Sequence, residues 1–151
     1  MSIETAIQTT KMSLTTKTVI NLMFTSRYIE DLATSKIKLH GLTLQQYNVL
    51  RILRGQNGNP ANLSDVQERM IDRNSNTTRL IDKLLTKGFV KRQTCPHNRR
   101  KVELFITEKG LEILKTLDPI TEQNNADILS NLTDSELNIL NNNLDKLRNN
   151  L

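Results

Sequence analysis

The chain has little of what secreted or membrane proteins of this size depend on. It holds one cysteine, no tryptophan and five glycines among 151 residues. A single cysteine cannot form an internal disulfide, which suits a reducing compartment. No apolar run approaches the roughly 18 residues that a membrane span needs, and the polar start of the chain lacks the layout of a secretion signal. We therefore expect a cytoplasmic protein that does not bind membranes.

The chain also lacks the residue sets that catalysis and metal binding require. It has no Gly-rich phosphate loop, no Ser/His/Asp set and no paired carboxylates on a cleft-forming pattern. Cys95 and His97 alternate near Pro96, but two ligands do not make a zinc site, and His40 is distant in sequence. We expect no enzymatic activity, no metal and no cofactor. Cys95 is either a redox-sensitive thiol or an ordinary one.

Positive charge is concentrated in one segment of the chain. Residues 73–101 contain nine basic residues and a single acid, Asp82, for a net charge of +8, whereas the rest of the chain carries −3. A local basic surface of this kind is typical of a phosphate-facing site, although a solvated basic face has the same composition. Charge alone leaves both interpretations open.

The first half of the chain is predicted to be helical. Residues 1–16 show no periodicity, and apolar residues recur near helical spacing over residues 17–38, with Gly41 ending that helix. Thr43 is a candidate N-cap for a second helix through residue 53. Residues 64–67 (SDVQ) fit a capping box that opens a short helix, and Asn74 is the expected N-cap of a helix over residues 75–87 that Gly88 ends. Two short helices so closely spaced predict a helix-turn-helix.

A basic β-hairpin follows the second of these helices. Residues 89–92 form the first predicted arm, and residues 93–98 form a turn-rich tip. Apolar and polar residues alternate from Val102 to Ile106, which indicates a returning strand. A hairpin in this position is a wing.

Two helices are predicted to close the chain. Thr107 is the expected N-cap of the first, which Pro119 kinks or interrupts. Residues 133–136 (TDSE) form a capping box for the second, where leucines then recur at steps of three and four. This seam packs either on the chain's own body or with the first helix across a subunit boundary. Two heptads are too short for a free coiled coil, which favours the second arrangement.

The order of these elements resembles the MarR (multiple antibiotic resistance regulator) family over nearly the whole chain. The stretches that carry the resemblance are residues 42–50 (LTLQQYNVL), 80–84 (LIDKL), 87–92 (KGFVKR), 96–100 (PHNRR) and 104–110 (LFITEKG). Each stretch is a weak signal, and their joint occurrence at these distances is fairly specific.

The resemblance implies a mainly α fold with a small β-wing, in which residues 1–151 form one domain. Residues 42–107 would be the winged helix-turn-helix lobe, and residues 17–40 and 108–151 the dimerisation helices. The implied function is that of a ligand-responsive homodimeric repressor that binds a near-palindromic site in double-stranded DNA. Its effector would be a small anionic or aromatic molecule.

The resemblance also assigns residues to the two interfaces. The start of the recognition helix would read bases in the major groove, and the wing arginines would enter the minor groove. The residues expected to contact DNA are Asn74, Ser75, Asn76, Thr77, Arg79, Lys83, Arg99, Arg100 and Lys101. Those expected at the dimer interface are Leu22, Ile29, Leu137, Leu140, Leu144, Leu147 and Leu151.

One position departs from the family pattern, and two other functions remain open. The family usually has an aspartate where this chain has Asn98, which can hydrogen-bond to the wing arginine but cannot form an ion pair with it. A winged-helix protein-interaction module would use the basic wing to meet an acidic partner. An RNA-binding protein is a weaker alternative, because the chain offers few aromatic residues for base stacking.

Overall fold

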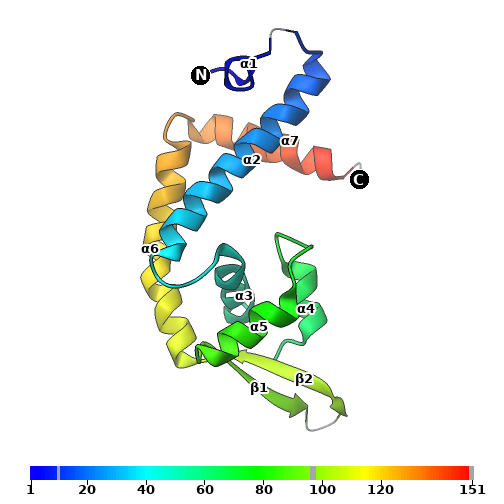
Figure 1. Ribbon diagram of the computed structural model, residues 1–151, viewed down its shortest axis with the longest axis vertical. Coiled ribbons are helices and arrows are strands. Elements are labelled where there is room, and N and C mark those ends of the chain that lie inside the picture. Colours follow the sequence, from blue (N-terminus) through cyan, green and yellow to red (C-terminus); the bar gives the residue numbers. More distant parts are fainter. Residues whose placement is uncertain (10, 96–97, 150–151) are drawn as a thin grey trace.

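A computed structural model describes residues 1–9, 11–95 and 98–149, without the side chains of residues 99–101. Long helices occupy one end of the elongated molecule and the hairpin the other, while α6 runs between them (Figure 1). No helix in these ranges is long and apolar enough to cross a membrane. In chain order the elements are α1 (Ile3–Ala6), α2 (Leu14–Lys38), α3 (Leu44–Arg54), α4 (Leu63–Arg69), α5 (Thr77–Thr86), β1 (Val90–Cys95), β2 (Asn98–Ile106), α6 (Glu108–Leu129) and α7 (Asp134–Arg148).

The wing is an antiparallel pair of strands that is longer than the sequence pattern indicates. Pairing runs in register from Val90 opposite Ile106 to Thr94 opposite Val102, and the register shifts before Cys95. The backbone of Ala61 exchanges two hydrogen bonds with Leu104, of 3.1 and 2.8 Å, which fixes the wing's base to the loop before α4. The predicted tip, residues 93–98, was therefore too long, because Gln93 and Thr94 pair with the second strand and continue β1.

The core of the molecule lies under the helix-turn-helix and the wing. It gathers apolar side chains from α3, α4, α5, both strands and the first half of α6, and one residue of α2, Ile37. The buried hydrophobic residues of this cluster are Ile37, Leu42, Tyr47, Val49, Leu50, Leu53, Ala61, Val66, Met70, Ile81, Leu84, Val90, Leu104, Leu114 and Leu117. This core holds α5 and the wing in a fixed relation to each other.

Several predicted helix ends are confirmed. Thr43, Thr107 and Thr133 are N-caps, and the capping boxes at Thr43 and Thr133 are closed from both sides. After α5, Gly88 adopts φ +74°, and its N–H donates to the carbonyl of Leu85 while the next N–H donates to that of Leu84. This pair of bonds is a Schellman motif, which requires a left-handed residue that glycine supplies without strain.

Other predicted boundaries were wrong. The first 16 residues are not irregular, because α1 is present and Ser13 caps α2. Asn62 caps α4 in place of Ser64, since its side chain and that of Asp65 each accept a backbone N–H of the other at 2.9 Å. Pro119 lies inside α6 without interrupting it.

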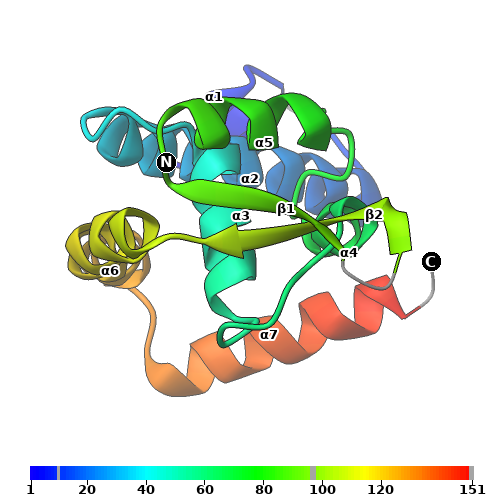
Figure 2. The same cartoon turned by 90° about the horizontal axis from the view of Figure 1, so that it is seen from below.

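The helices outside the lobe bury little of themselves within one chain. Of the residues of α2 only Ile37 is buried, and α7 has no buried residue. The two helices overlap in one view but stand apart when the molecule is turned, so α7 lies alongside the body rather than within it (Figures 1 and 2). Both helices expose large apolar side chains, including Met23 and Phe24 on α2 and Ile139 and Leu147 on α7.

Candidate nucleic-acid interface

Helix α5 has one buried face and one polar face. Thr77, Ile81 and Leu84 follow the spacing of successive helical turns and are all at most 3% exposed, so they attach the helix to the core. The opposite face lies at the surface of the lobe, at the wing end of the molecule (Figure 2). Its exposed side chains are those of Thr78, Arg79, Asp82, Lys83 and Thr86.

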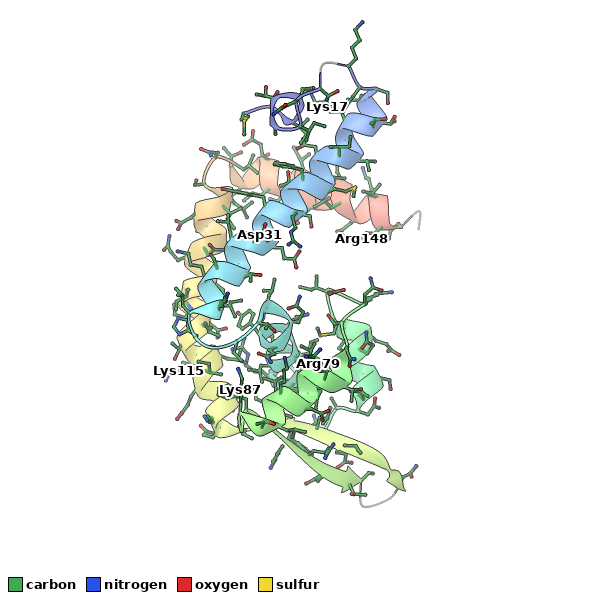
Figure 3. The ribbon with its side chains drawn as sticks, in the orientation of Figure 1. Lys17, Asp31, Arg79, Lys87, Lys115 and Arg148 are labelled. Carbon is green, nitrogen blue, oxygen red and sulfur yellow. The ribbon has the colours of Figure 1, made fainter. Side chains whose placement is uncertain are left out.

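The start of α5 lies two residues later than predicted. Asn76, not Asn74, is the N-cap, and its Oδ1 accepts the backbone N–H of Arg79 at 3.0 Å. Asn74 instead lies in the turn, where its own N–H donates to the Oδ1 of Asp72. Both asparagines and Arg79 are exposed, so the structure places these predicted contacts at the surface of the helix-turn-helix. Arg79 lies near the beginning of α5 and Lys87 at its end (Figure 3).

Two predicted DNA contacts point into the lobe. Thr77 is 3% exposed, and its hydroxyl donates to the side chain of Gln67 on α4. The hydroxyl of Ser75 is buried and has no hydrogen-bond partner among the described residues. The assignment of these two side chains to DNA is corrected, because the later start of α5 turns both of them inward.

Three residues at or beneath this surface were not predicted to belong to it. Thr78 is exposed in the first turn of α5, and the sequence analysis did not assign it to DNA because it placed the start of the helix two residues earlier. Asp82 is also exposed, one turn further along the same face, and puts a carboxylate among the cations. Gln67 was predicted to close a capping box with Ser64, but its side chain instead bonds Arg73 and Thr77 across the turn, a contact that no local pattern indicates.

The wing extends the positive surface of α5. Lys91 and Arg92 are exposed on β1, and the Lys91 ammonium lies 5.3 Å from the centre of the Phe105 ring. Between the strands, Gln93 donates to Glu103 at 3.0 Å. Asn98 begins β2 and is exposed, while Cys95 is half-buried.

The predicted minor-groove residues belong to β2, but their side chains are not described. The backbone of Arg99, Arg100 and Lys101 lies in the strand, so the structure places them on the wing without locating their charges. Residues 96 and 97, at the expected tip, lie outside the described residues. The roles of the three basic residues therefore remain predictions.

Ion pairs do not neutralise the basic side chains that the structure describes on α5 and β1. The salt bridges of the described side chains lie elsewhere: Lys17 with Glu4, Arg27 with Glu30 and Asp31, Arg54 with Asp118, and Arg148 with Asp145. The hydrogen bonds that the Arg54 guanidinium donates to the Asp118 carboxylate raise the pKa of Arg54 further above its usual range. Within residues 73–95 no basic side chain forms an ion pair, so the positive charge of α5 and β1 is available to a polyanion.

Fold and surface together define a DNA-binding winged helix, and comparison with known proteins identifies its family. The family model of MarR matches residues 42–102. A MarR transcription factor from Planctomyces limnophilus is 31% identical in sequence, with 90% of this chain and 98% of that chain covered and a TM-score of 0.70. The chain belongs to the MarR family of helix-turn-helix transcriptional regulators.

Two further proteins extend this comparison. The HTH-type transcriptional regulator YkoM of Bacillus subtilis (strain 168) is 32% identical over 99 residues, which span 66% of this chain and 63% of YkoM. A MarR mutant from E. coli, crystallised as a complex with operator DNA, has the same fold at 22% identity, with 83% of this chain and 89% of that chain covered and a TM-score of 0.75.

Proposed function

We propose that this protein is a homodimeric repressor that binds a near-palindromic operator in double-stranded DNA and acts in the cytoplasm. The observation that carries the proposal is the unpaired basic surface of α5 and β1, which the core holds in one rigid lobe. Exposed Asn76, Thr78 and Arg79 suit contacts with base edges, and Lys83 and Lys91 suit contacts with phosphate. The complex of E. coli MarR with operator DNA supports the same use of the fold.

The homodimer is proposed from the exposed apolar surface of the long helices. Large apolar side chains lie on nearly every side of the first half of α2, including Val19, Met23 and Phe24. Apolar side chains gathered on a helix are normally covered, and within one chain Ile37 is the one residue of α2 that is buried. Covering this surface with a second copy removes it from water, which stabilises the pair.

The leucine seam of α7 takes part in the same proposed interface. A groove of about 580 Å³ separates α2 from α7 and is lined by Leu22, Ile29, Leu140 and Leu144, among others. Leu147 is half exposed and Leu137 half-buried, so the chain's own body does not cover the seam. We infer that helices of the partner subunit fill this groove. Leu151 lies outside the described residues and remains a predicted contact.

A second cavity suits the proposed small-molecule effector. About 590 Å³ in volume, it lies between α2, α3 and the turn before α5. Arg27 and Arg51 line it, and the Arg51 guanidinium lies 5.7 Å from the ring centre of Tyr47, also in the lining. Glu30 lines the cavity as well and pairs with Arg27, which leaves Arg51, beside the Tyr47 ring, to meet an anionic or aromatic molecule. Because Ile71 and Asp72 line it too, a bound molecule would shift α5 relative to α2 and change the spacing of the two recognition helices.

Selection of bound sequences from a random duplex library tests the proposed function. We expect one enriched motif with two inverted halves, bound more tightly than unselected duplex by a factor of about 10³ or more. The affinity should fall steeply between about 50 and 200 mM salt. An absence of sequence preference would reject the proposal and favour a module that binds an acidic protein partner.

Competition between nucleic acids tests the remaining alternative, an RNA-binding protein. Single-stranded RNA and DNA of the selected sequence should displace the duplex only at far higher concentrations, because the described surface offers no row of exposed aromatic side chains. Stronger binding of the single strands would instead support an RNA-binding function.

A further inference from the structure

One side chain of α4 holds both ends of the segment that precedes the recognition helix. The Nε2 of Gln67 donates to the backbone carbonyl of Arg73 at 2.7 Å. Its Oε1 accepts the hydroxyl of Thr77, the first residue of α5. These two bonds engage both ends of the amide, so its orientation is fixed.

Asn76, one of the residues proposed to contact base edges, lies between these two attachment points, and Thr78 and Arg79 follow directly after the second. Asn74 and Asn76 are exposed, and the remaining bonds that shape the turn are local, from the N–H groups of Asn74 and Ser75 to Asp72. Gln67 differs from these because it connects the turn to the preceding helix, whose Val66 is fully buried in the core. The amide therefore transmits the rigidity of the core to the start of α5.

We infer that Gln67 is a positioning residue for DNA recognition, acting through Thr77 and the Arg73 carbonyl rather than by touching DNA. Holding the segment in one conformation before binding lowers the entropy that a specific complex must lose. Non-specific binding, which rests on phosphate charge, needs no such order. This inference rests on the proposed DNA-binding function for its effect on affinity, but not for its effect on the free protein.

Gln67→Met and Thr77→Val separate the two bonds. The first keeps the length of the side chain and removes both bonds, whereas the second keeps the shape of Thr77 and removes one. Gln123→Met and Thr116→Val are matched controls, since both residues lie on α6 and make exposed hydrogen bonds there. The double variant Gln67→Met/Thr77→Val replaces the polar pair with an apolar pair, which leaves no buried donor without a partner.

Amide hydrogen exchange of the free protein tests the inference without DNA. In Gln67→Met we expect exchange of residues 73–79 to rise about tenfold or more, while exchange of core amides on α3 stays unchanged. Thr77→Val should give a smaller rise in the same segment, and the α6 controls none. A uniform rise over the whole lobe, or no rise in that segment, would overturn the positioning role.

Binding to the selected duplex then measures the consequence. Gln67→Met should lose about tenfold in affinity for that duplex, with the affinity for random duplex and the salt slope unchanged. The double variant should recover thermal stability but not affinity, because the Arg73 carbonyl is still released. Recovery of affinity together with stability would show a purely structural role. If the wild type shows no sequence preference, the proposed function fails, and the exchange result alone decides the role of Gln67.

Discussion

The two ends of this molecule bury their apolar residues in different ways. In the lobe, α3, α5 and the wing share one core, and residues such as Leu50 and Leu84 are fully buried. At the other end, α2 buries one residue and α7 none, although both helices are rich in apolar side chains. The lobe is thus a folded unit within one chain, whereas the long helices need a surface that the chain does not supply. Breaking each end should therefore have different consequences.

The largest expected effect comes from a cavity in the lobe. Leu84→Ala should lower the free energy of unfolding by about 2–5 kcal/mol, because a fully buried leucine leaves a void. Leu147→Ala on α7, where the leucine is half exposed, is the matched variant. Denaturation is followed by circular dichroism. The loss of unfolding free energy in Leu84→Ala should be the same at every protein concentration, whereas the loss in Leu147→Ala should change with concentration. Losses of unfolding free energy that are equal in the two variants and independent of protein concentration would contradict the comparison.

A charge in the leucine seam should break the other end. Leu144→Glu is expected to give monomers in sedimentation experiments, because the seam cannot cover a carboxylate. Loss of the second half-site contact should weaken binding to the selected duplex by about a hundredfold or more. Asn143→Glu places the same charge on an exposed position of α7 and should leave the dimer intact. Intact dimers of the Leu144→Glu variant would show that the seam packs internally.

A change in the wing tests the contribution of charge to DNA binding without disturbing either packed end of the molecule. Arg100→Ala should weaken duplex binding and lower the salt slope by about one unit, as expected for one lost phosphate contact. Lys115→Ala, on α6 and away from the wing, is the control that should change neither quantity (Figure 3). An unchanged affinity and slope for Arg100→Ala would remove the wing from the proposed interface.

A smaller effect is expected from the acid within the basic surface. Asp82→Asn removes an exposed negative charge from the outer face of α5, so binding to random duplex should rise about two- to fivefold at low salt. Glu112→Gln, exposed on α6, makes the same change of charge and should have no effect. A rise of equal size in both variants would mean that only net charge matters.

The smallest expected effect concerns the start of α7. Hydrogen bonds from the backbone and hydroxyl of Thr133 lower the pKa of Glu136. A lowered pKa in the folded state stabilises that state above the usual carboxyl pKa of about 4.3, and this contribution is lost as the pH falls through the lowered pKa. The protection factor of the Thr133 amide, which compares its exchange with the intrinsic rate at each pH, should fall as the pH drops over that range, and Glu136→Gln should remove this change. Loss of protection of the Thr133 amide already at neutral pH would contradict this assignment.

The sequence predicted those elements whose signals are local. Helical spacing of apolar residues located the long helices, and Gly88 marked the end of α5 because its left-handed conformation is a property of one residue. Alternation over residues 102–106 indicated the second strand, whose central Leu104 is buried. The N-cap at Thr43 and the capping box at Thr133 were likewise predicted from residues within one turn of the helix start.

The sequence failed where several residues compete for one role. Asn74, Ser75 and Asn76 are all good N-caps, and Asn76 is the one whose side chain accepts the backbone N–H of Arg79. Ser64 competed with Asn62 in the same way, and Asn62 formed the reciprocal pair with Asp65. Which face of α5 is buried depends on that first residue, so the reading residues were identified only in part.

The half-site spacing of a bound duplex tests the central claim most directly. Hydroxyl-radical footprinting of the selected duplex should show two equivalent protected regions about one helical turn, or 10–10.5 base pairs, apart. That pattern is expected if a dimer presents two copies of α5 to successive major grooves. A single protected region, or equal protection of a random duplex, would contradict the account.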